Sequence, residues 1–295
     1  MLSPWLEATD SGDGSTAARE QLATWSDICG LDLITLGTTA SAEEITDTAV
    51  TQPLVVAATL LAYAELTQRR GRPLGDDVIV AGHSVGEIAA YAIAGVISPD
   101  DAVMLAATRG REMAKACAVE ATGMAAVLGG DEAEVLARLD QLDLVPANRN
   151  AVGQIVAAGR LTALDKLAED PPAKARVRKL ATAGAFHTEF MAPAMSAYSA
   201  AAQQVATAEP SATVLSNRDG QPLASAAAAM EQLVAQLTRP VRWDLCTETL
   251  RDRGVTAIVE FPPAGTLAGI AKRELRGTPT HAVKSPADLD GLPEF

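Results

Sequence analysis

The sequence GHSVGE at residues 82–87 fits the GxSxG pattern of a serine nucleophile. It lies between a short apolar run at 77–81, which predicts a buried strand, and a helical pattern at 87–95 that ends with a glycine. A strand that turns sharply into a helix places the serine at the carboxyl edge of a sheet, with the helix N-terminus beneath it. We therefore predict that Ser84 is a nucleophile and that the Val85 N–H faces a developing oxyanion.

A serine nucleophile needs a base, and the chain has three histidines. His83 lies beside the nucleophile, where a packing or hydrogen-bonding role is favoured. His281 lies in a tail rich in proline and threonine, where we expect it on the surface. His187 directly follows a segment of shorter predicted strands and helices, at a boundary between two parts of the chain where a pocket would form. We favour His187 as the base, and a structural histidine is the alternative.

The composition excludes several classes of protein. With 24 basic and 37 acidic residues the chain has a formal charge of −13, so we expect no nucleic-acid partner. The best apolar run, 53–64, is shorter than the roughly 18 residues that span a bilayer, so we expect no membrane segment. The three cysteines form no CxxC pair, which indicates neither a disulfide framework nor a metal site. A start without signal-peptide features adds to the prediction of a cytoplasmic protein.

Strands and helices that alternate along the chain predict the α/β class. Residues 51–69 fit a helix with Pro53 in its first turn, and residues 255–261 and 267–275 fit a later buried strand and helix. With the elbow at Ser84, these elements predict a large α/β-hydrolase-like domain with a parallel sheet.

Shorter units lie in the middle of the chain and follow the order βαββαβ, which is the ferredoxin-like arrangement. They are the strand 124–128, the helix 131–142, the strands 144–151 and 154–158, the helix 161–169 and the strand 175–180. We expect a small ferredoxin-like α+β domain inserted at 122–183, and a large domain formed by 1–121 and 184–295.

A set of motifs in chain order resembles the malonyl-CoA:acyl carrier protein transacylases and the acyltransferase domains of polyketide and fatty-acid synthases. The motifs are GHSVGE at 82–87, Thr108-Arg109-Gly110 with Met113, the segment with Asn148, Asn150 and Gln154, Phe186-His187, and the segment 240–243. The resemblance covers nearly the whole chain and is nearest to the stand-alone actinobacterial enzymes of type II fatty-acid or mycolic-acid synthesis.

The resemblance implies a ping-pong transfer that uses no cofactor and no metal. Ser84 would accept the malonyl group of malonyl-CoA and pass it to the phosphopantetheine thiol of acyl carrier protein, with His187 as general acid and base. It also implies that a backbone carbonyl, that of Arg242, orients His187 in place of an acid.

Further residues take a role only through the resemblance. Arg109 would hold the free malonyl carboxylate with two parallel hydrogen bonds, whereas sequence alone favours a surface arginine there. Phe186 is the bulky residue that accompanies malonyl selection in synthase domains. Gln52, His83 and Asn150 match pocket positions, and the alternative role of Gln52 and Asn150 is to satisfy backbone groups.

The family begins with an apolar strand and a GQGSQ-type loop, whose glutamine supplies a second oxyanion N–H. The present sequence starts at Met1-Leu2, where that loop would have ended, and has no equivalent glutamine. Loss of one oxyanion donor lowers the rate on the order of 10² to 10³-fold. We therefore expect a truncated or misassigned start, with reduced stability or activity of the chain as it stands.

Acyl carrier proteins are strongly acidic, so a chain with a formal charge of −13 needs a locally basic face to bind one. Lys174, Arg176, Arg178 and Lys179 form a stretch without acids at the edge of the insertion. We expect this stretch to dock the carrier, and charge balance with nearby acids is the alternative. We expect the protein to be a monomer.

Two other functions stay open at this point. A serine hydrolase or thioesterase of the α/β-hydrolase type has its histidine late in the chain, so it would use His281 with Asp244 or Glu260 as the acid. A non-catalytic remnant that still binds a carrier protein is the second alternative.

Overall fold

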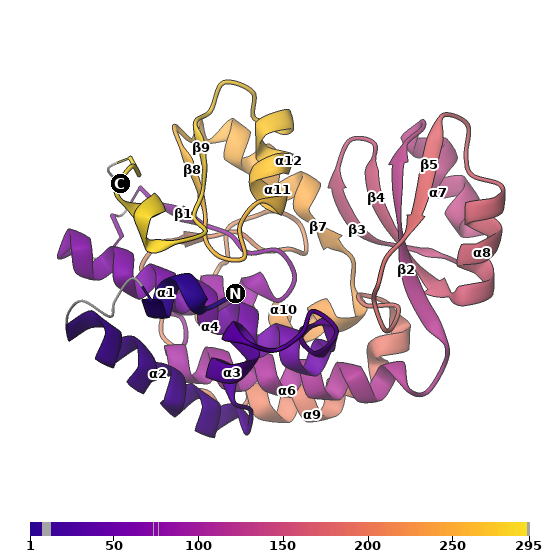
Figure 1. Cartoon of the computed structure of the whole chain (residues 1–295). Coiled ribbons are helices and arrows are strands. Elements are labelled where there is room, and N and C mark those ends of the chain that lie inside the picture. The colour runs from indigo at the N-terminus through magenta and orange to yellow at the C-terminus, as the bar shows by residue number, and fades with distance from the viewer. Residues whose placement is uncertain (8–12, 73, 76, 294–295) are drawn as a thin grey trace.

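The computed structural model describes residues 1–7, 13–72, 74–75 and 77–293. Figure 1 shows a larger lobe that contains both chain termini and a smaller lobe beside it, built on a sheet. The helices are α1 (Ser3–Glu7), α2 (Asp13–Cys29), α3 (Leu33–Thr38), α4 (Thr48–Arg70), α5 (Gly86–Ile93), α6 (Pro99–Cys117), α7 (Glu132–Gln141), α8 (Leu161–Glu169), α9 (Ala192–Ala202), α10 (Ala226–Ala235), α11 (Trp243–Asp252) and α12 (Thr266–Glu274). Short 3₁₀ turns are η1 (Glu44–Thr46), η2 (Glu189–Met191), η3 (Gln236–Thr238) and η4 (Pro286–Leu289).

The strands of the described chain form a five-stranded sheet and two parallel pairs. They are β1 (Ile79–Val80), β2 (Thr122–Gly129), β3 (Val145–Ala151), β4 (Gln154–Arg160), β5 (Ala175–Lys179), β6 (Thr213–Val214), β7 (Val241–Arg242), β8 (Ile258–Glu260) and β9 (Thr280–Ala282). In the large lobe β1 pairs with β6, and β8 pairs with β9, both in parallel. The predicted α/β class with parallel strands is therefore confirmed, although the strand expected at 77–81 has only two residues and β6 was not predicted.

Helix α4 is a core helix of the large lobe. The side chain of Asp47 caps its first turn, and Gly71 ends it in the left-handed conformation. Because the helix begins at Thr48, Pro53 lies in its second turn. The sequence pattern had placed it in the first turn. By length and composition α4 is long and apolar enough to cross a membrane, which the shorter apolar run at 53–64 did not reveal, and 56% of its apolar window is buried inside the fold. Such burial is the usual property of a core helix.

The small lobe has the predicted βαββαβ order. Its strand order is β5-β2-β4-β3, and each of these neighbours is antiparallel, which is the ferredoxin-like arrangement. Helices α7 and α8 cover one face, where Val135, Leu139, Leu164 and Leu167 pack on the sheet. The domain boundaries at 121/122 and 183/184 stay a prediction.

The sheet of the small lobe has a fifth strand that the sequence did not reveal. Strand β7 joins it in parallel beside β3, at Asn148 and Arg149. The amide of Arg242 on β7 also donates to the carbonyl of Asn217, in the loop that follows β6. Strand β7 therefore ties the small sheet to the large lobe.

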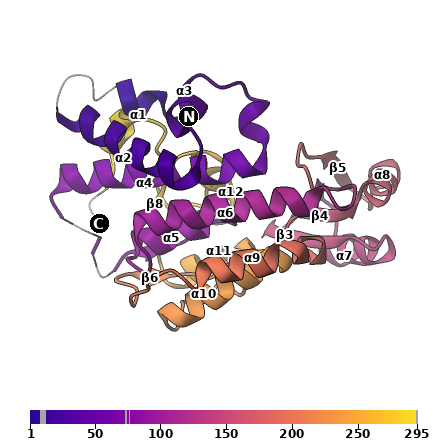
Figure 2. The ribbon, with the colours of Figure 1, turned by 90° about the horizontal axis from the view of Figure 1, so that it is seen from below.

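Helix α6 packs along both α4 and α9, as Figure 2 shows from below. At Gly110 on α6 an added Cβ would lie 2.5 Å from the backbone oxygen of Thr48 on α4. Only glycine permits this close approach, because the atom in the way is backbone and cannot rotate aside. The contact brings the residue before it, Arg109, against the buried first turns of α4.

We expect the substitution Gly110→Ala to lower the free energy of unfolding by about 1–3 kcal/mol, because the added methyl group overpacks the two helices. Urea denaturation of the whole chain would measure this. The matched control is Gly269→Ala on α12, where an added Cβ meets no atom within 4 Å. Alanine there should raise stability by up to about 1 kcal/mol through its helix propensity. Equal effects at the two sites would contradict the close approach of α4 and α6.

Candidate active site

Ser84 lies in a sharp turn between β1 and α5, as predicted. Its φ is 54°, a left-handed conformation that costs a non-glycine residue free energy and occurs at functional turns. At Gly82 an added Cβ would lie 2.0 Å from the carbonyl oxygen of Gly86, so the turn requires glycine at the first position. At Gly86 no atom lies within 4 Å of an added Cβ, so the second glycine of the pattern is not required by space.

His187 and Ser84 lie within hydrogen-bond distance. The Nε2 atom of His187 is 2.7 Å from the Oγ atom of Ser84, and the Nδ1 atom is 2.8 Å from the carbonyl oxygen of Gln236. A carbonyl can only accept, so Nδ1 carries the proton and Nε2 is free to accept from the serine hydroxyl. Burial, then the charge of Arg109, lowers the pKa of His187 to about 3. The histidine is therefore a neutral base at physiological pH.

The carbonyl that orients His187 belongs to Gln236 and not to Arg242, so that prediction was wrong. Gln236 begins η3, directly after α10, and its carbonyl also accepts from the backbone amide of Arg239 over 3.4 Å. A carbonyl oxygen has two lone pairs, so it can accept from a side chain as well. The side chain of Arg242 instead forms an ion pair with Asp244, with an N–O distance of 2.8 Å.

Arg109 is buried beside the nucleophile, with 1% of its surface exposed. Its Nη1 atom donates to Oε1 of Gln52 over 2.7 Å, and its Nη2 atom donates to Oε1 of Gln236 over 2.9 Å. Nη2 also lies 3.4 Å from Oγ of Ser84. The surface arginine that sequence alone favoured is therefore excluded, and the guanidinium faces the space where a group attached to Ser84 would lie.

A buried polar network behind the nucleophile was missed by the sequence analysis. The side chain of Asn217 accepts from the Ser84 amide and donates to the Gly82 carbonyl, each over 2.7 Å. The carboxyl group of Glu87 accepts from the amide of Asn217 over 2.7 Å and from Nε2 of Gln236 over 2.5 Å. Glu87 is the last residue of the GHSVGE motif, so an acid directed inward from the first turn of α5 was a usable signal.

His83 and Asn150 contact each other. Nε2 of His83 lies 2.8 Å from Oδ1 of Asn150 on β3, and the imidazole packs against Trp243 with ring centroids 5.5 Å apart. Burial lowers the pKa of His83, so its ring is neutral. This pair links the nucleophile turn to the small lobe. The contacts agree with the packing and hydrogen-bonding role favoured for His83, whereas Asn150 bonds a side chain and not a backbone group.

Val85 directly follows Ser84 in the sequence, and Phe186 directly precedes His187. Phe186 precedes the base and packs between the core of the large lobe and the apolar face of the small sheet. The amides of Gly86 and Glu87 donate to carbonyls of the turn, whereas the N–H of Val85 donates to no acceptor in the described chain. That N–H is therefore available to a ligand.

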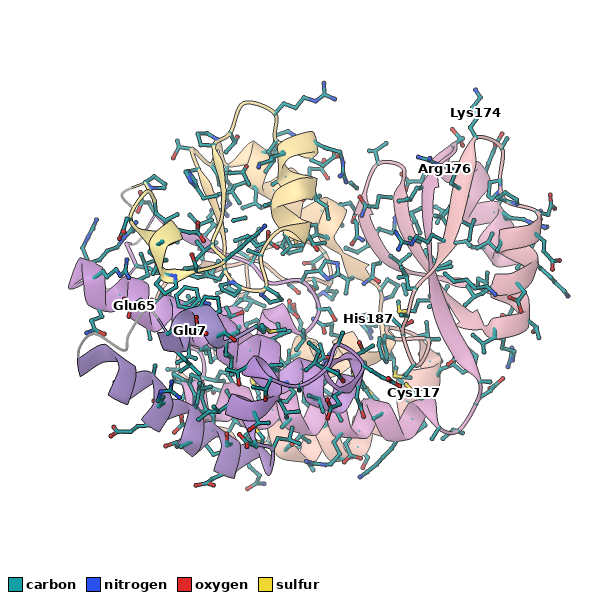
Figure 3. All side chains as sticks on the ribbon, in the orientation of Figure 1. Glu7, Glu65, Cys117, Lys174, Arg176 and His187 are labelled. Atoms are coloured by element: carbon teal, nitrogen blue, oxygen red, sulfur yellow. The ribbon has the colours of Figure 1, made fainter. Side chains whose placement is uncertain are left out.

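The basic stretch of the small lobe lies apart from this cluster. Lys174, Arg176 and Arg178 are exposed, and Lys179 forms an ion pair with Asp165. Figure 3 shows Lys174 and Arg176 near the outer end of the small lobe, away from His187. The structure thus brings together Ser84, His187, Arg109 and Gln52, and leaves the basic stretch at a distance. Within the described ranges, no group of three or more metal-ligating side chains comes together.

The residues that a serine hydrolase would need are engaged elsewhere. His281 lies in β9, paired with Val259, and not in the surface tail that we expected. The carboxylate of Glu260 accepts from three amides at the start of α12, and Asp244 pairs with Arg242. Since Ser84 contacts His187, the structure gives no support to a triad with His281.

These contacts are typical of one class of protein, the acyl-transferring enzymes: a serine hydroxyl beside a histidine without an acidic partner, with a buried cation next to them. The acyl transferase domain family matches residues 16–287, and the chain belongs to this family. It is 76% identical to the malonyl CoA-acyl carrier protein transacylase of Mycolicibacterium smegmatis, over the full length of both chains.

Solved structures agree. The crystal structure of this transacylase from Mycobacterium tuberculosis is 73% identical in sequence, with a TM-score of 0.92 over 98% of this chain and 93% of that one. A malonyl-transacylase in complex with a type II polyketide acyl-carrier protein is 28% identical, with a TM-score of 0.89 over 98% and 93% of the two chains.

We expect His187 to remain neutral, with its proton on Nδ1, from pH 5 to 8, because its pKa lies near 3. Nitrogen-15 NMR of the histidine side chains measures both properties, and the His187→Ala spectrum assigns the signal among three histidines. A titration midpoint near the ordinary value of about 6.5 would contradict the burial and the Arg109 contact that lower this pKa.

Proposed function

We propose that the protein transfers the malonyl group from malonyl-CoA to the phosphopantetheine thiol of acyl carrier protein. The observation that carries this proposal is the contact of Ser84 with both His187 and the buried guanidinium of Arg109. A serine and a histidine transfer acyl groups in general, whereas a buried cation beside them favours an acyl group with a free carboxylate. Malonyl differs from acetyl by this carboxylate. The names and structures of the relatives support the same substrate and carrier.

The first half of the reaction acylates the serine. Nε2 of His187 removes the hydroxyl proton of Ser84 as its oxygen attacks the thioester carbonyl. The Val85 N–H, at the start of α5, stabilises the oxyanion. The C–S bond then breaks, the imidazolium returns its proton to the leaving CoA thiolate, and malonyl-serine remains.

The second half repeats these steps with a new thiol. His187 removes the proton of the phosphopantetheine thiol, whose sulfur attacks the malonyl-serine ester. The C–O bond breaks, and the imidazolium protonates the oxygen of Ser84. Free enzyme and malonyl-carrier are the products, so a bound cofactor has no part in the proposed reaction.

The pocket residues serve the malonyl group in this proposal. Each terminal nitrogen of Arg109 has two N–H donors, so one N–H of each binds the malonyl carboxylate while the other keeps its bond to Gln52 or Gln236. Phe186 limits the width of the pocket beside the base. His83 and Asn150 hold the nucleophile turn against the small lobe.

The carrier is proposed to dock along the sheet of the small lobe. Ala175 and Val177 on β5 face the core under α7 and α8, so Arg176 and Arg178 point to the opposite face. That face also holds Val156, which packs in the cluster with Phe186, next to the base. Its cations suit an acidic carrier that approaches the active site.

We infer the remaining properties from this reaction. The carrier and CoA are the partners, and neither a nucleic acid nor a membrane is proposed as one. The protein acts in the cytoplasm as a monomer and supplies extender units for fatty-acid or mycolic-acid synthesis.

The intact mass of the chain after brief incubation with malonyl-CoA tests the function. We expect a malonyl adduct on Ser84 in the wild type and in His281→Ala, and roughly 10² to 10⁴-fold slower formation in His187→Ala, which lacks the base. Loss of the adduct only in His281→Ala would favour the hydrolase. Carrier binding without any adduct would identify a non-catalytic remnant.

Charge reversal on the proposed docking face should weaken carrier binding. We expect the double variant Arg176→Glu/Arg178→Glu to raise the KM for the carrier several-fold and to leave the KM for malonyl-CoA unchanged. The matched control is Arg138→Glu on α7, where Arg138 pairs with Asp170 on the helical side of the lobe. Equal effects on both substrates, or an equal effect of the control, would refute this docking face.

A further inference from the structure

Among the acidic, lysine and arginine side chains of the described residues, only those of Glu87 and Arg109 are buried, and their charges are opposite. Each has about 1% of its surface exposed. A buried charge is costly unless an opposite charge or polar partners compensate it. The two do not touch, and one side chain, that of Gln236, joins them. Its Nε2 atom donates to Glu87 over 2.5 Å and its Oε1 atom accepts from Arg109 over 2.9 Å.

We infer that Glu87 is a positioning residue for malonyl selection, because it fixes the orientation of the Gln236 amide and thereby holds the Arg109 guanidinium beside Ser84. The inference rests on the proposed function and adds a residue to it. Glu87 does not contact the substrate or the reacting atoms.

The direction of each hydrogen bond supports this role. An ionised carboxylate only accepts, so Glu87 favours the orientation in which Gln236 presents its nitrogen inward and its oxygen to Arg109. The Ser84 carbonyl and Oδ1 of Asn217, 3.2 and 3.3 Å from the same nitrogen, favour this orientation as well, and the carboxylate is its shortest and only charged acceptor. The other carboxylate oxygen accepts from the backbone N–H of Asn217, and the side-chain oxygen of Asn217 accepts from the Ser84 amide. Glu87 therefore contacts both the side chain of Gln236, which accepts from Arg109, and the backbone of Asn217, whose side chain holds the Ser84 turn.

A neutral amide at position 87 could not satisfy the same partners. The N–H₂ group of a glutamine there would face either the amide of Asn217 or Nε2 of Gln236, and both are donors. If it faces Gln236, two donors meet, and that side chain avoids the clash by turning over, away from the Ser84 carbonyl and Oδ1 of Asn217, which presents its own N–H₂ group to Arg109. The guanidinium then loses an acceptor and is repelled from its position.

The protonation of Glu87 adds a dependence on pH. Burial raises the pKa of Glu87 to about 7, against the opposing effects of its two hydrogen bonds and of Arg109. Above pH 7 the carboxylate form predominates, and below pH 7 a proton disturbs the acceptor pattern. A cavity of about 40 Å³, large enough for a water molecule, lies against Glu87 and Gln236.

Other titratable groups near Glu87 do not account for such a dependence. Burial raises the pKa values of Tyr91, Tyr198 and Cys246, which stay neutral from pH 5.5 to 8.5. The pKa of His187 is about 3, so this base does not titrate in that range. The remaining charged groups that act on Glu87 or line the cavity are Arg109, Arg218, Asp219, Glu231 and Arg239.

The experiment measures selection directly. The chain is mixed with equimolar malonyl-CoA and acetyl-CoA, and intact mass gives the ratio of malonyl-serine to acetyl-serine at early times. We expect Glu87→Gln to lower this ratio at least about 10-fold, the effect of losing a hydrogen bond to a charged group. The matched control, Glu231→Gln, changes the same residue type at the cavity and should leave the ratio unchanged. Equal slowing of both acylations by Glu87→Gln would overturn the inference, because it would indicate a structural role.

The wild type provides a second measurement that does not depend on the folding of a variant. Its malonyl-to-acetyl ratio should fall as the pH is lowered through 7, while the malonyl carboxylate stays ionised. A ratio that is constant from pH 5.5 to 8.5 would overturn the inference. Absence of any malonyl adduct in the wild type would refute the proposed function, a result distinct from loss of selection.

Discussion

The buried guanidinium of Arg109 is the constraint on which the rest of the site depends. A cation without water requires acceptors and a compensating charge, and these come from three elements that lie far apart in the sequence. Gln52 is supplied by α4, Gln236 by η3, and the carboxylate by Glu87 on α5. Helix α6 can carry this cation only because Gly110 lets it lie against the backbone of α4. The close packing of α4 and α6 and the position of the buried charge therefore depend on each other.

Gln236 links the two halves of the active site. Its carbonyl orients His187, its side-chain oxygen accepts from Arg109, and its side-chain nitrogen donates to Glu87. A single residue thus positions both the base and the cation that recognises the acyl group. Because these bonds share one rigid turn at the end of α10, a shift of that turn would alter nucleophile activation and recognition together.

The sequence predicted those features that have a local pattern. Helix α8 has the predicted bounds, the ferredoxin-like order is confirmed, and the contact of Ser84 with His187 was anticipated. Features made by distant partners were missed. The carbonyl of Gln236 has no residue signature, since every residue has a carbonyl, and strand β6 is two residues long, too short for periodicity to reveal. The burial of Arg109 could not be predicted from the residue type and its helix, because an arginine on a helix normally faces solvent.

Arg109, the cation proposed to bind the malonyl carboxylate, also acts on the pKa of His187. In the free enzyme Arg109 disfavours a second positive charge nearby and contributes to the low pKa of His187. In the proposed reaction the malonyl carboxylate compensates this cation, so the imidazolium that forms during attack meets less repulsion. An acetyl group offers no such compensation. Selection for malonyl therefore acts on the chemical step as well as on binding, because the substrate completes the electrostatic environment that the histidine needs.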